Sequence, residues 1–203
     1  MSARYGNPAR GLSVILISGE RGKTTTATFL AAILKEAGRR TSVLSGDYDT
    51  STEHFYKSLS KCKKEQTALV LIEATDRLLE IGALQGLSVD TLIVTDENEQ
   101  AHSFMSLGPK HVVAPIGFSV PDGSVEPYQQ ITYGDAEDAD ARIDNIKLYR
   151  QGTEVSLTID HQTKLDVATY YAGYANATDL VAATAAAYVL AVPHDSEIGR
   201  AHV

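Results

Sequence analysis

The chain has 203 residues, which is enough for one α/β domain with a hydrophobic core. Its 26 acidic and 18 basic residues give a formal net charge of −8, and this acidic balance argues against nucleic acid or an anionic membrane as a partner. No apolar stretch is long enough to span a membrane, and the first ten residues lack the apolar core of a signal peptide, so we expect a cytoplasmic protein.

The first 120 residues alternate between strand-like and helix-like segments. Residues 12–18 form an apolar, β-rich run, and residues 23–37 carry apolar positions at helical spacing up to Gly38, a residue typical of helix ends. Further strands are predicted at 41–45, 68–73, 89–95 and 111–116, and further helices at 51–60 and 75–84. This alternation predicts an α/β fold of the P-loop type, with a mostly parallel sheet flanked by helices.

The pattern changes after residue 120. Residues 128–133 are predicted to be extended, and the alternating segments 142–150 and 153–160 around Gln151-Gly152 indicate a small C-terminal β-hairpin region. The acidic segment between residues 134 and 141 is predicted to be a solvated loop. An Ala-rich last helix is predicted at 177–192, ending before Pro193. Since no linker is evident, we expect residues 1–203 to form a single domain.

The segment Gly19-Glu20-Arg21-Gly22-Lys23-Thr24, followed by Thr25, lies between the first predicted strand and helix. Glycines allow backbone N–H groups to converge on phosphate oxygens, and a helix N-terminus adds partial positive charge. In such loops the lysine reaches the β- and γ-phosphates and the threonine hydroxyl can bind Mg²⁺. The segment therefore predicts a site for ATP with Mg²⁺, whereas a glycine turn that merely starts a helix is the structural alternative.

Acidic residues follow two other predicted strands. Glu73 ends an apolar run, and carboxyl ends of parallel strands border the ligand crevice in such sheets, so Glu73 is a second candidate Mg²⁺ ligand beside Thr24. Asp47 and Asp49 follow the strand at 41–45 and are either site residues or ordinary loop residues. Cys62 is expected to be an ordinary half-exposed cysteine, and His102 and His111 are expected to be surface histidines.

The motifs resemble the central, ATP-binding domain of the Mur ligase family, whose loop reads GTNGKT. Gly19, Gly22, Lys23, Thr24 and Thr25 match that loop, while Glu20 and Arg21 replace Thr and Asn. The sequence LIEATD around Glu73 is similar to the family's Mg²⁺-binding glutamate motif, and TYG at 132–134 is similar to a family segment. GYAN at 173–176 resembles a motif whose first Asn approaches adenine, which implies that role for Asn176; Asp179 stands where the motif has its second Asn.

Departures from the family pattern affect the expected activity. Thr95-Asp96 begins a segment in which the family's DH pair is lost, and His102 is out of register with it. The nearest counterpart of a metal-binding lysine is Lys110, in a different context. The family's N-terminal UDP-binding and C-terminal ligase domains have no counterpart in these 203 residues. The resemblance thus implies an ATP·Mg²⁺-binding central domain, related to peptidoglycan-precursor ligases, that is weakly active or inactive alone.

Three interpretations follow for the function. The chain is a stand-alone domain that acts as a scaffold, as a homo-oligomer or with a protein partner that supplies the missing ligase domains, or it is one fragment of an active ligase. The alternative is a dimeric P-loop ATPase of the partitioning or maturation-factor kind, in which GKTTTA loops also occur. That class usually has an additional lysine early in the loop, and this chain has none there.

Overall fold

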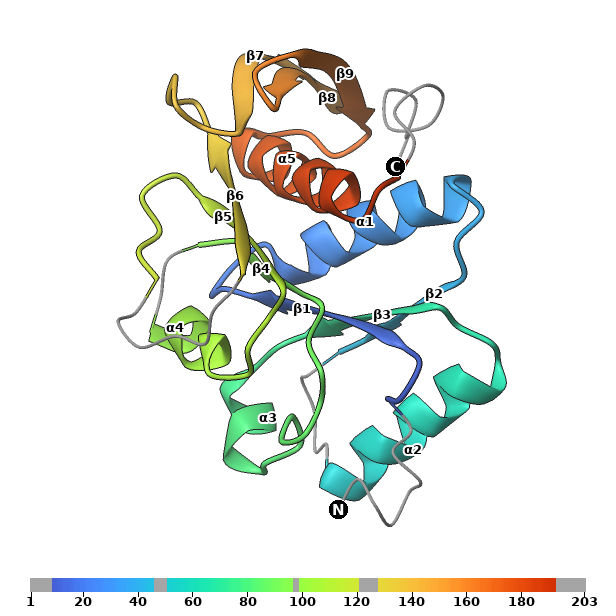
Figure 1. Ribbon diagram of the computed structural model, residues 1–203. Coiled ribbons are helices and arrows are strands. Elements are labelled where there is room, and N and C mark those ends of the chain that lie inside the picture. Colours follow the sequence, from blue (N-terminus) through green and yellow to red (C-terminus); the bar gives the residue numbers. More distant parts are fainter. Residues whose placement is uncertain (1–8, 46–50, 97–98, 121–127, 193–203) are drawn as a thin grey trace.

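The computed structural model describes residues 9–45, 51–96, 99–120 and 128–192. In these residues nine strands form one sheet in the order β2-β3-β1-β4-β5-β6-β7-β8-β9 (Figure 1). The strands are β1 (Ser13–Ser18), β2 (Thr41–Leu44), β3 (Leu69–Glu73), β4 (Thr91–Val94), β5 (His111–Pro115), β6 (Gln129–Gly134), β7 (Ala141–Tyr149), β8 (Gly152–Ile159) and β9 (Thr163–Thr169). The helices are α1 (Lys23–Glu36), α2 (Thr52–Lys64), α3 (Asp76–Glu80), α4 (Glu99–Met105) and α5 (Tyr174–Val189).

The sheet changes from parallel to antiparallel pairing at β7. All neighbours from β2 to β7 pair in parallel, whereas β7, β8 and β9 pair antiparallel. The register places Ile17 of β1 beside Glu73 of β3, and Ser18 of β1 beside Val94 of β4. The carboxyl ends of these three strands therefore meet at one edge of the sheet, where ligands bind in open α/β sheets.

Helices cover both faces of the parallel part of the sheet, and each face has its own hydrophobic core. Helices α1 and α5 lie together on one face, where they pack against Ile15 and Ile17 of β1 (Figure 1). Helices α2, α3 and α4 cover the other face and pack against Val14 and Leu16 of the same strand. Since successive side chains of a strand point to opposite faces, a fully apolar strand such as β1 suits a sheet buried on both sides.

The expected α/β fold is confirmed, and the differences concern mostly element lengths. The strands predicted before residue 134, the hairpin and the long helices are present, and Gly38 ends α1 with φ 70°. Helix α2 extends to Lys64, while α3 is shorter than predicted because Gly82, at φ 63°, leaves the helical conformation. Helix α5 begins three residues before the predicted start. Helix α4 and strand β9 were not predicted.

Two expectations about individual residues are wrong, and one about a segment is met only in part. Cys62 is only 4% exposed, because its place on α2 lies on the same helix face as the buried Phe55 and Leu59. The acidic segment is a loop whose residues 135–138 are mostly exposed, as predicted, but its end is not solvated, since Ala139 and Ala141 are buried and the Asp140 side chain accepts hydrogen bonds from Thr132. His102 and His111 are half-buried rather than on the surface.

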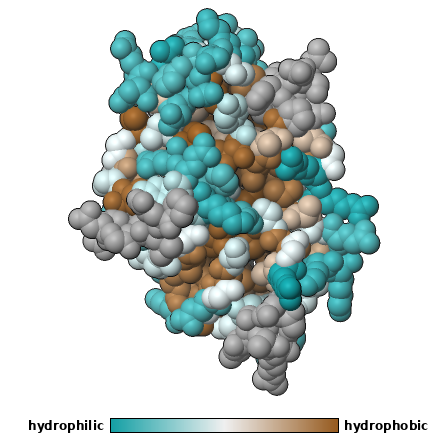
Figure 2. All heavy atoms as spheres, viewed as in Figure 1, coloured by the Kyte–Doolittle hydropathy of each residue, from teal (hydrophilic) through white to brown (hydrophobic). Residues whose placement is uncertain are grey.

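The outer face of the antiparallel strands is hydrophilic, and its polar residues lie at the top of the view in Figure 2. Among the described residues, no helix combines the length and the apolar character needed to cross a membrane. Asp47 and Asp49 lie outside the described residues.

Candidate functional site

Gly19–Gly22 form the loop that joins β1 to α1. Gly22 is the N-cap of α1 in a left-handed conformation, and a Cβ atom there would lie 2.3 Å from Oδ1 of Asp179 on α5. At Gly19 a Cβ atom would lie 2.0 Å from Oγ1 of Thr95, just after β4. Both positions therefore require glycine, because the loop backbone lies against the end of β4 at Gly19 and against helix α5 at Gly22.

The end of β4 holds the first half of the loop. The Asp96 carboxylate accepts hydrogen bonds from the N–H groups of Glu20, at 2.7 Å, and Arg21, at 3.1 Å. The Thr95 hydroxyl donates to the backbone oxygens of Ser18, at 3.1 Å, and Arg21, at 2.5 Å. These four contacts fix the loop backbone without using the side chains of Glu20 and Arg21, which are exposed.

The N-terminal turn of α1 leaves backbone donors without acceptors. The first helical bond runs from Thr26 N–H to the Gly22 oxygen, at 2.8 Å. Within the part of the chain that the structure describes, the N–H groups of Gly22 and of residues 23–25 have no hydrogen-bond acceptor. Four donors at the positive end of a 14-residue helix suit an anion such as phosphate.

The Lys23 side chain lies over the same loop. Its ammonium group donates to the backbone oxygens of Gly19 and, at 3.4 Å, of Glu20. Carbonyl oxygens are neutral acceptors, and phosphate oxygens would form stronger, charge-assisted hydrogen bonds with the same ammonium. The lysine is thus close to where a phosphate bound by the helix N-terminus would lie.

The two predicted metal ligands are brought together by the pairing of β1 with β3. The Thr24 hydroxyl donates to Oε2 of Glu73 at 2.6 Å, and Glu73 is only 6% exposed at the end of β3. A hydroxyl and a carboxylate beside this helix N-terminus are the oxygen ligands that Mg²⁺ prefers. The donor set present therefore fits Mg²⁺ with a bound nucleotide.

Four residues at the loop were not among the predicted site residues: Thr95, Asp96, Tyr133 and Asp179. The buried Tyr133 of β6 donates its hydroxyl to the oxygens of Val94, at 2.9 Å, and Thr95, at 3.2 Å. It thereby supports the end of β4, and burial together with Asp179 and Asp96 raises the pKa of its phenol. Burial, followed by the nearby Asp96, raises the pKa of the Asp179 carboxyl to about 6. Position directly after a buried strand is the signal that could have identified Thr95 and Asp96.

Asn176 lies in the first turn of α5, one turn before Asp179 and hence on the same side of the helix. Its side-chain amide donates to the Ala172 oxygen at 2.8 Å. Exposed tyrosines surround this turn, and the ring of Tyr171 meets Phe29 of α1 edge to face at 5.7 Å. Asn176 thus faces the loop side of α5 next to aromatic surface.

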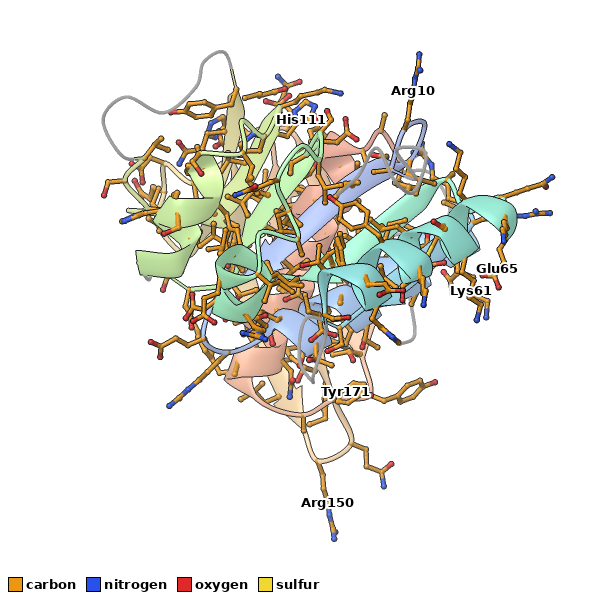
Figure 3. The ribbon with its side chains drawn as sticks, turned by 90° about the horizontal axis from the view of Figure 1, so that it is seen from below. Arg10, Lys61, Glu65, His111, Arg150 and Tyr171 are labelled. Atoms are coloured by element: carbon orange, nitrogen blue, oxygen red, sulfur yellow. The ribbon has the colours of Figure 1, made fainter. Side chains whose placement is uncertain are left out.

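Other candidate metal ligands are not brought to the loop. Lys110 forms an ion pair with Asp90 before β4, at the amino end of that strand, and His111 starts β5 at the same end (Figure 3). Half-buried His102 contacts Phe118 at 5.3 Å between ring centres. Across the described ranges, no three His, Cys, Asp or Glu side chains form a cluster that could hold a metal ion.

Two cavities, of about 590 and 520 Å³, lie at the other end of α1. Both are lined by Gly38, Arg39 and Arg40, and the larger one also by Glu65, which follows α2 (Figure 3). These cavities are separated from the loop by the length of the helix. An open loop between strand ends binds phosphate through backbone donors rather than by enclosure, so the candidate site remains at Gly19–Thr25.

Comparison with known proteins relates the chain to one group of enzymes. No protein-family model matches the chain. The UDP-N-acetylmuramoyl-L-alanyl-D-glutamate--2,6-diaminopimelate ligase of Bacillus velezensis is 27% identical over 96% of this chain and 47% of its own length. The chain is homologous to the Mur ligases. It spans about half the length of the curated Mur ligases that it matches.

Solved structures show the same fold. A UDP-N-acetylmuramoyl-L-alanyl-D-glutamate--2,6-diaminopimelate ligase superimposes with a TM-score of 0.78 at 17% identity, over 92% of this chain and 45% of that one. Mycobacterium tuberculosis folylpolyglutamate synthase, whose structures are described as complexed with ADP and AMPPCP, gives a TM-score of 0.72 at 12% identity, over 98% of this chain and 60% of that one. The similarity to ligases gives no support to the alternative interpretation of the chain as a partitioning-type ATPase.

Proposed function

We propose that the chain binds ATP with Mg²⁺ at Gly19–Thr25, as the nucleotide-binding part of a Mur-ligase-like amide ligase. The observation that carries this proposal is the turn at the start of α1, where four N–H groups without an acceptor among the described residues, the Lys23 ammonium and the Thr24–Glu73 pair lie together. The ADP and AMPPCP complexes named for a related fold support a nucleotide as the ligand.

Each group has a separate task in this proposal. The amides of residues 22–25 and the Lys23 ammonium bind phosphate oxygens, while Asp96 and Thr95 keep the loop in shape. Thr24 and Glu73 hold Mg²⁺, which would neutralise charge on the phosphates. The resemblance of GYAN to the family motif supports Asn176 as the residue that binds the adenine, and it lies one turn before Asp179, which contacts Gly22 of the loop.

The ligase context is proposed from the relatives. Their names describe ligation to UDP-N-acetylmuramoyl peptides, which are precursors of peptidoglycan. Amide-bond formation with ATP depends on positioning a carboxylate in line with the γ-phosphate, in addition to charge stabilisation. We propose that residues 1–203 form the central domain alone, and that a protein partner, a further domain or another copy supplies the substrate-holding groups.

Nucleotide binding can be tested with Lys23→Ala. The loss of a charge-assisted contact should weaken ATP·Mg²⁺ binding by about 1.5–3 kcal/mol in calorimetric titration. Lys35→Ala is the matched control, because it removes the same charge from the exposed last turn of the same helix. If ATP binds both variants and the original chain with equal affinity, the loop is not the site.

A further inference from the structure

Two carboxylates lie against the proposed phosphate-binding loop, one beside Gly19 and the other beside Gly22. Asp96, after β4, accepts hydrogen bonds from the first two amides of the loop. Asp179, on α5, lies against Gly22 so closely that a Cβ atom at that glycine would be 2.3 Å from its Oδ1. Two acids therefore lie beside a loop whose remaining donors suit an anion, an arrangement that opposes anion binding when both are charged.

The two acids are not equivalent. Asp96 accepts two backbone hydrogen bonds, which favour its ionised form. For Asp179 the described residues offer its side chain no hydrogen-bond donor, and it is partly buried. The titratable groups that face it are Asp96 and, from β6, Tyr133, while the cations of the loop are Arg21 and Lys23, whose ammonium is directed to Gly19 and Glu20. Asp179 is consequently the member of the pair that takes up a proton.

We propose that Asp96 and Asp179 are positioning residues that couple nucleotide binding to the uptake of one proton by Asp179. The inference rests on the proposed nucleotide site and extends it to the regulation of that site by pH. A bound phosphate places further negative charge near Asp179, so the neutral carboxylic acid is favoured in the complex. Protonation removes one like charge from the loop, and nucleotide affinity rises as the pH falls.

The direction follows from the linkage between protons and ligand. In the free protein the pKa of Asp179 is raised to about 6, so the side chain is mostly ionised at pH 7.5 and mostly neutral at pH 5. If a bound phosphate raises this pKa by one further unit, affinity increases about tenfold on acidification through that range.

The test compares the original chain with Asp179→Asn and Asp96→Asn in calorimetric titrations of Mg·ATP from pH 5.5 to 8.0. Two buffers of different ionisation enthalpy at pH 7.0 give the number of protons taken up on binding. Asp166→Asn is the matched control, because it removes an exposed aspartate of β9 that contacts Ser156 and not the loop. ATP itself also titrates in this range, and that contribution is common to all variants.

The expected result is that the original chain and the Asp166 variant gain more affinity on acidification, and take up more protons, than Asp179→Asn. Asp179→Asn should bind at pH 7.5 at least as tightly as the original chain. Equal pH profiles and proton counts for the original chain and Asp179→Asn would overturn the inference while leaving nucleotide binding intact. Absence of binding by the original chain at every pH would instead remove the proposed function and, with it, the coupling.

Thermal melts without nucleotide test separately whether Asp179 holds a proton in the folded protein. The folded state keeps the Asp179 proton up to about pH 6, whereas an aspartate in the unfolded chain, with its ordinary pKa of 3.8, loses it near that pH, so the stability of the original chain falls as the pH rises through this window. The melting temperature of Asp179→Asn, relative to that of the original chain, should therefore rise between pH 4 and pH 7. For Asp96→Asn the pH range over which stability falls should move to lower pH, because the charge of Asp96 no longer raises the pKa of Asp179. A pH-independent difference in both variants would contradict a proton on Asp179.

Discussion

At the scale of single residues, the backbone amides of the loop fall into two groups. Some are hydrogen-bonded within the protein, and the others are available to a ligand. The amides of Glu20 and Arg21 are already bonded to Asp96, so they are satisfied before any ligand arrives. The amides of the first turn of α1 lack such acceptors among the described residues. Preorganised donors lose little freedom when a ligand binds, and this favours affinity for phosphate.

Glu73 gives the clearest test of the metal assignment. We expect Glu73→Gln to weaken Mg·ATP binding by about 1.5–3 kcal/mol, because the carboxylate charge at the metal is lost. The loss should be smaller when a chelator removes Mg²⁺, and calorimetric titration under both conditions measures the difference. Glu80→Gln is the control, since Glu80 is exposed on α3 and pairs only with Arg77 in the described structure. Equal losses with and without Mg²⁺ would remove Glu73 from the metal site.

At the scale of elements, α5 connects the antiparallel region to the loop at Gly19–Gly22. Its buried face packs against α1 and the sheet, and its second turn brings Asp179 against Gly22 of the loop. Most of its buried residues are alanines, which allow the two helices to approach closely. The few larger side chains, such as Leu180 and Val181, therefore carry much of the apolar contact.

We expect Leu180→Ala to lower the free energy of unfolding by about 2–5 kcal/mol, because it leaves a cavity between α5 and its neighbours. Urea denaturation followed by circular dichroism measures this loss. Leu148→Ala is the matched control, since Leu148 of β7 is 54% exposed and its truncation should change stability by less than about 0.5 kcal/mol. Similar losses for both variants would mean that α5 is not packed as described.

The elements that could be predicted are those with a strong local pattern. Apolar runs marked β1, β3, β4 and β5, and the turn at Gln151-Gly152 marked the hairpin. Strand β9 carries Lys164 and Asp166 on its exposed side and owes its conformation to pairing with β8, so its own sequence is a weak signal. Helix α3 ends early for a local reason, the left-handed Gly82, that apolar spacing does not reveal.

At the scale of the whole molecule, the site could be predicted only where its residues are adjacent in sequence or end a buried strand. Glycine spacing and Lys23 indicated the loop, and Glu73 was found because it ends β3. The support from Asp96, Tyr133 and Asp179 depends on the order of strands β1, β4 and β6 and on the packing of α5. Long-range packing of this kind leaves no spacing pattern in the sequence.

The proposal that these residues form only a central domain also limits the activity that we expect of them. The described residues contain no cluster of three His, Cys, Asp or Glu side chains that could hold a metal ion, and Lys110 is paired with Asp90 at the amino end of β4. We expect these 203 residues alone to bind ATP but to form no amide bond. Incubation with ATP, Mg²⁺, a muramyl-peptide precursor and a set of amino acids, followed by mass spectrometry, tests this. Ligated product above the level without protein would show that the chain supplies the groups assigned here to a partner.

The burial of Cys62 has a practical consequence for measuring local opening of the structure. It is the single cysteine of the sequence and lies on the buried face of α2 at 4% exposure, so a thiol reagent can reach it only when α2 separates from the sheet. The rate of its alkylation therefore reports how often that face opens. A ligand that stabilises the ends of β1 and β3 would slow this reaction, and the natural sequence thus carries its own probe, without any introduced label.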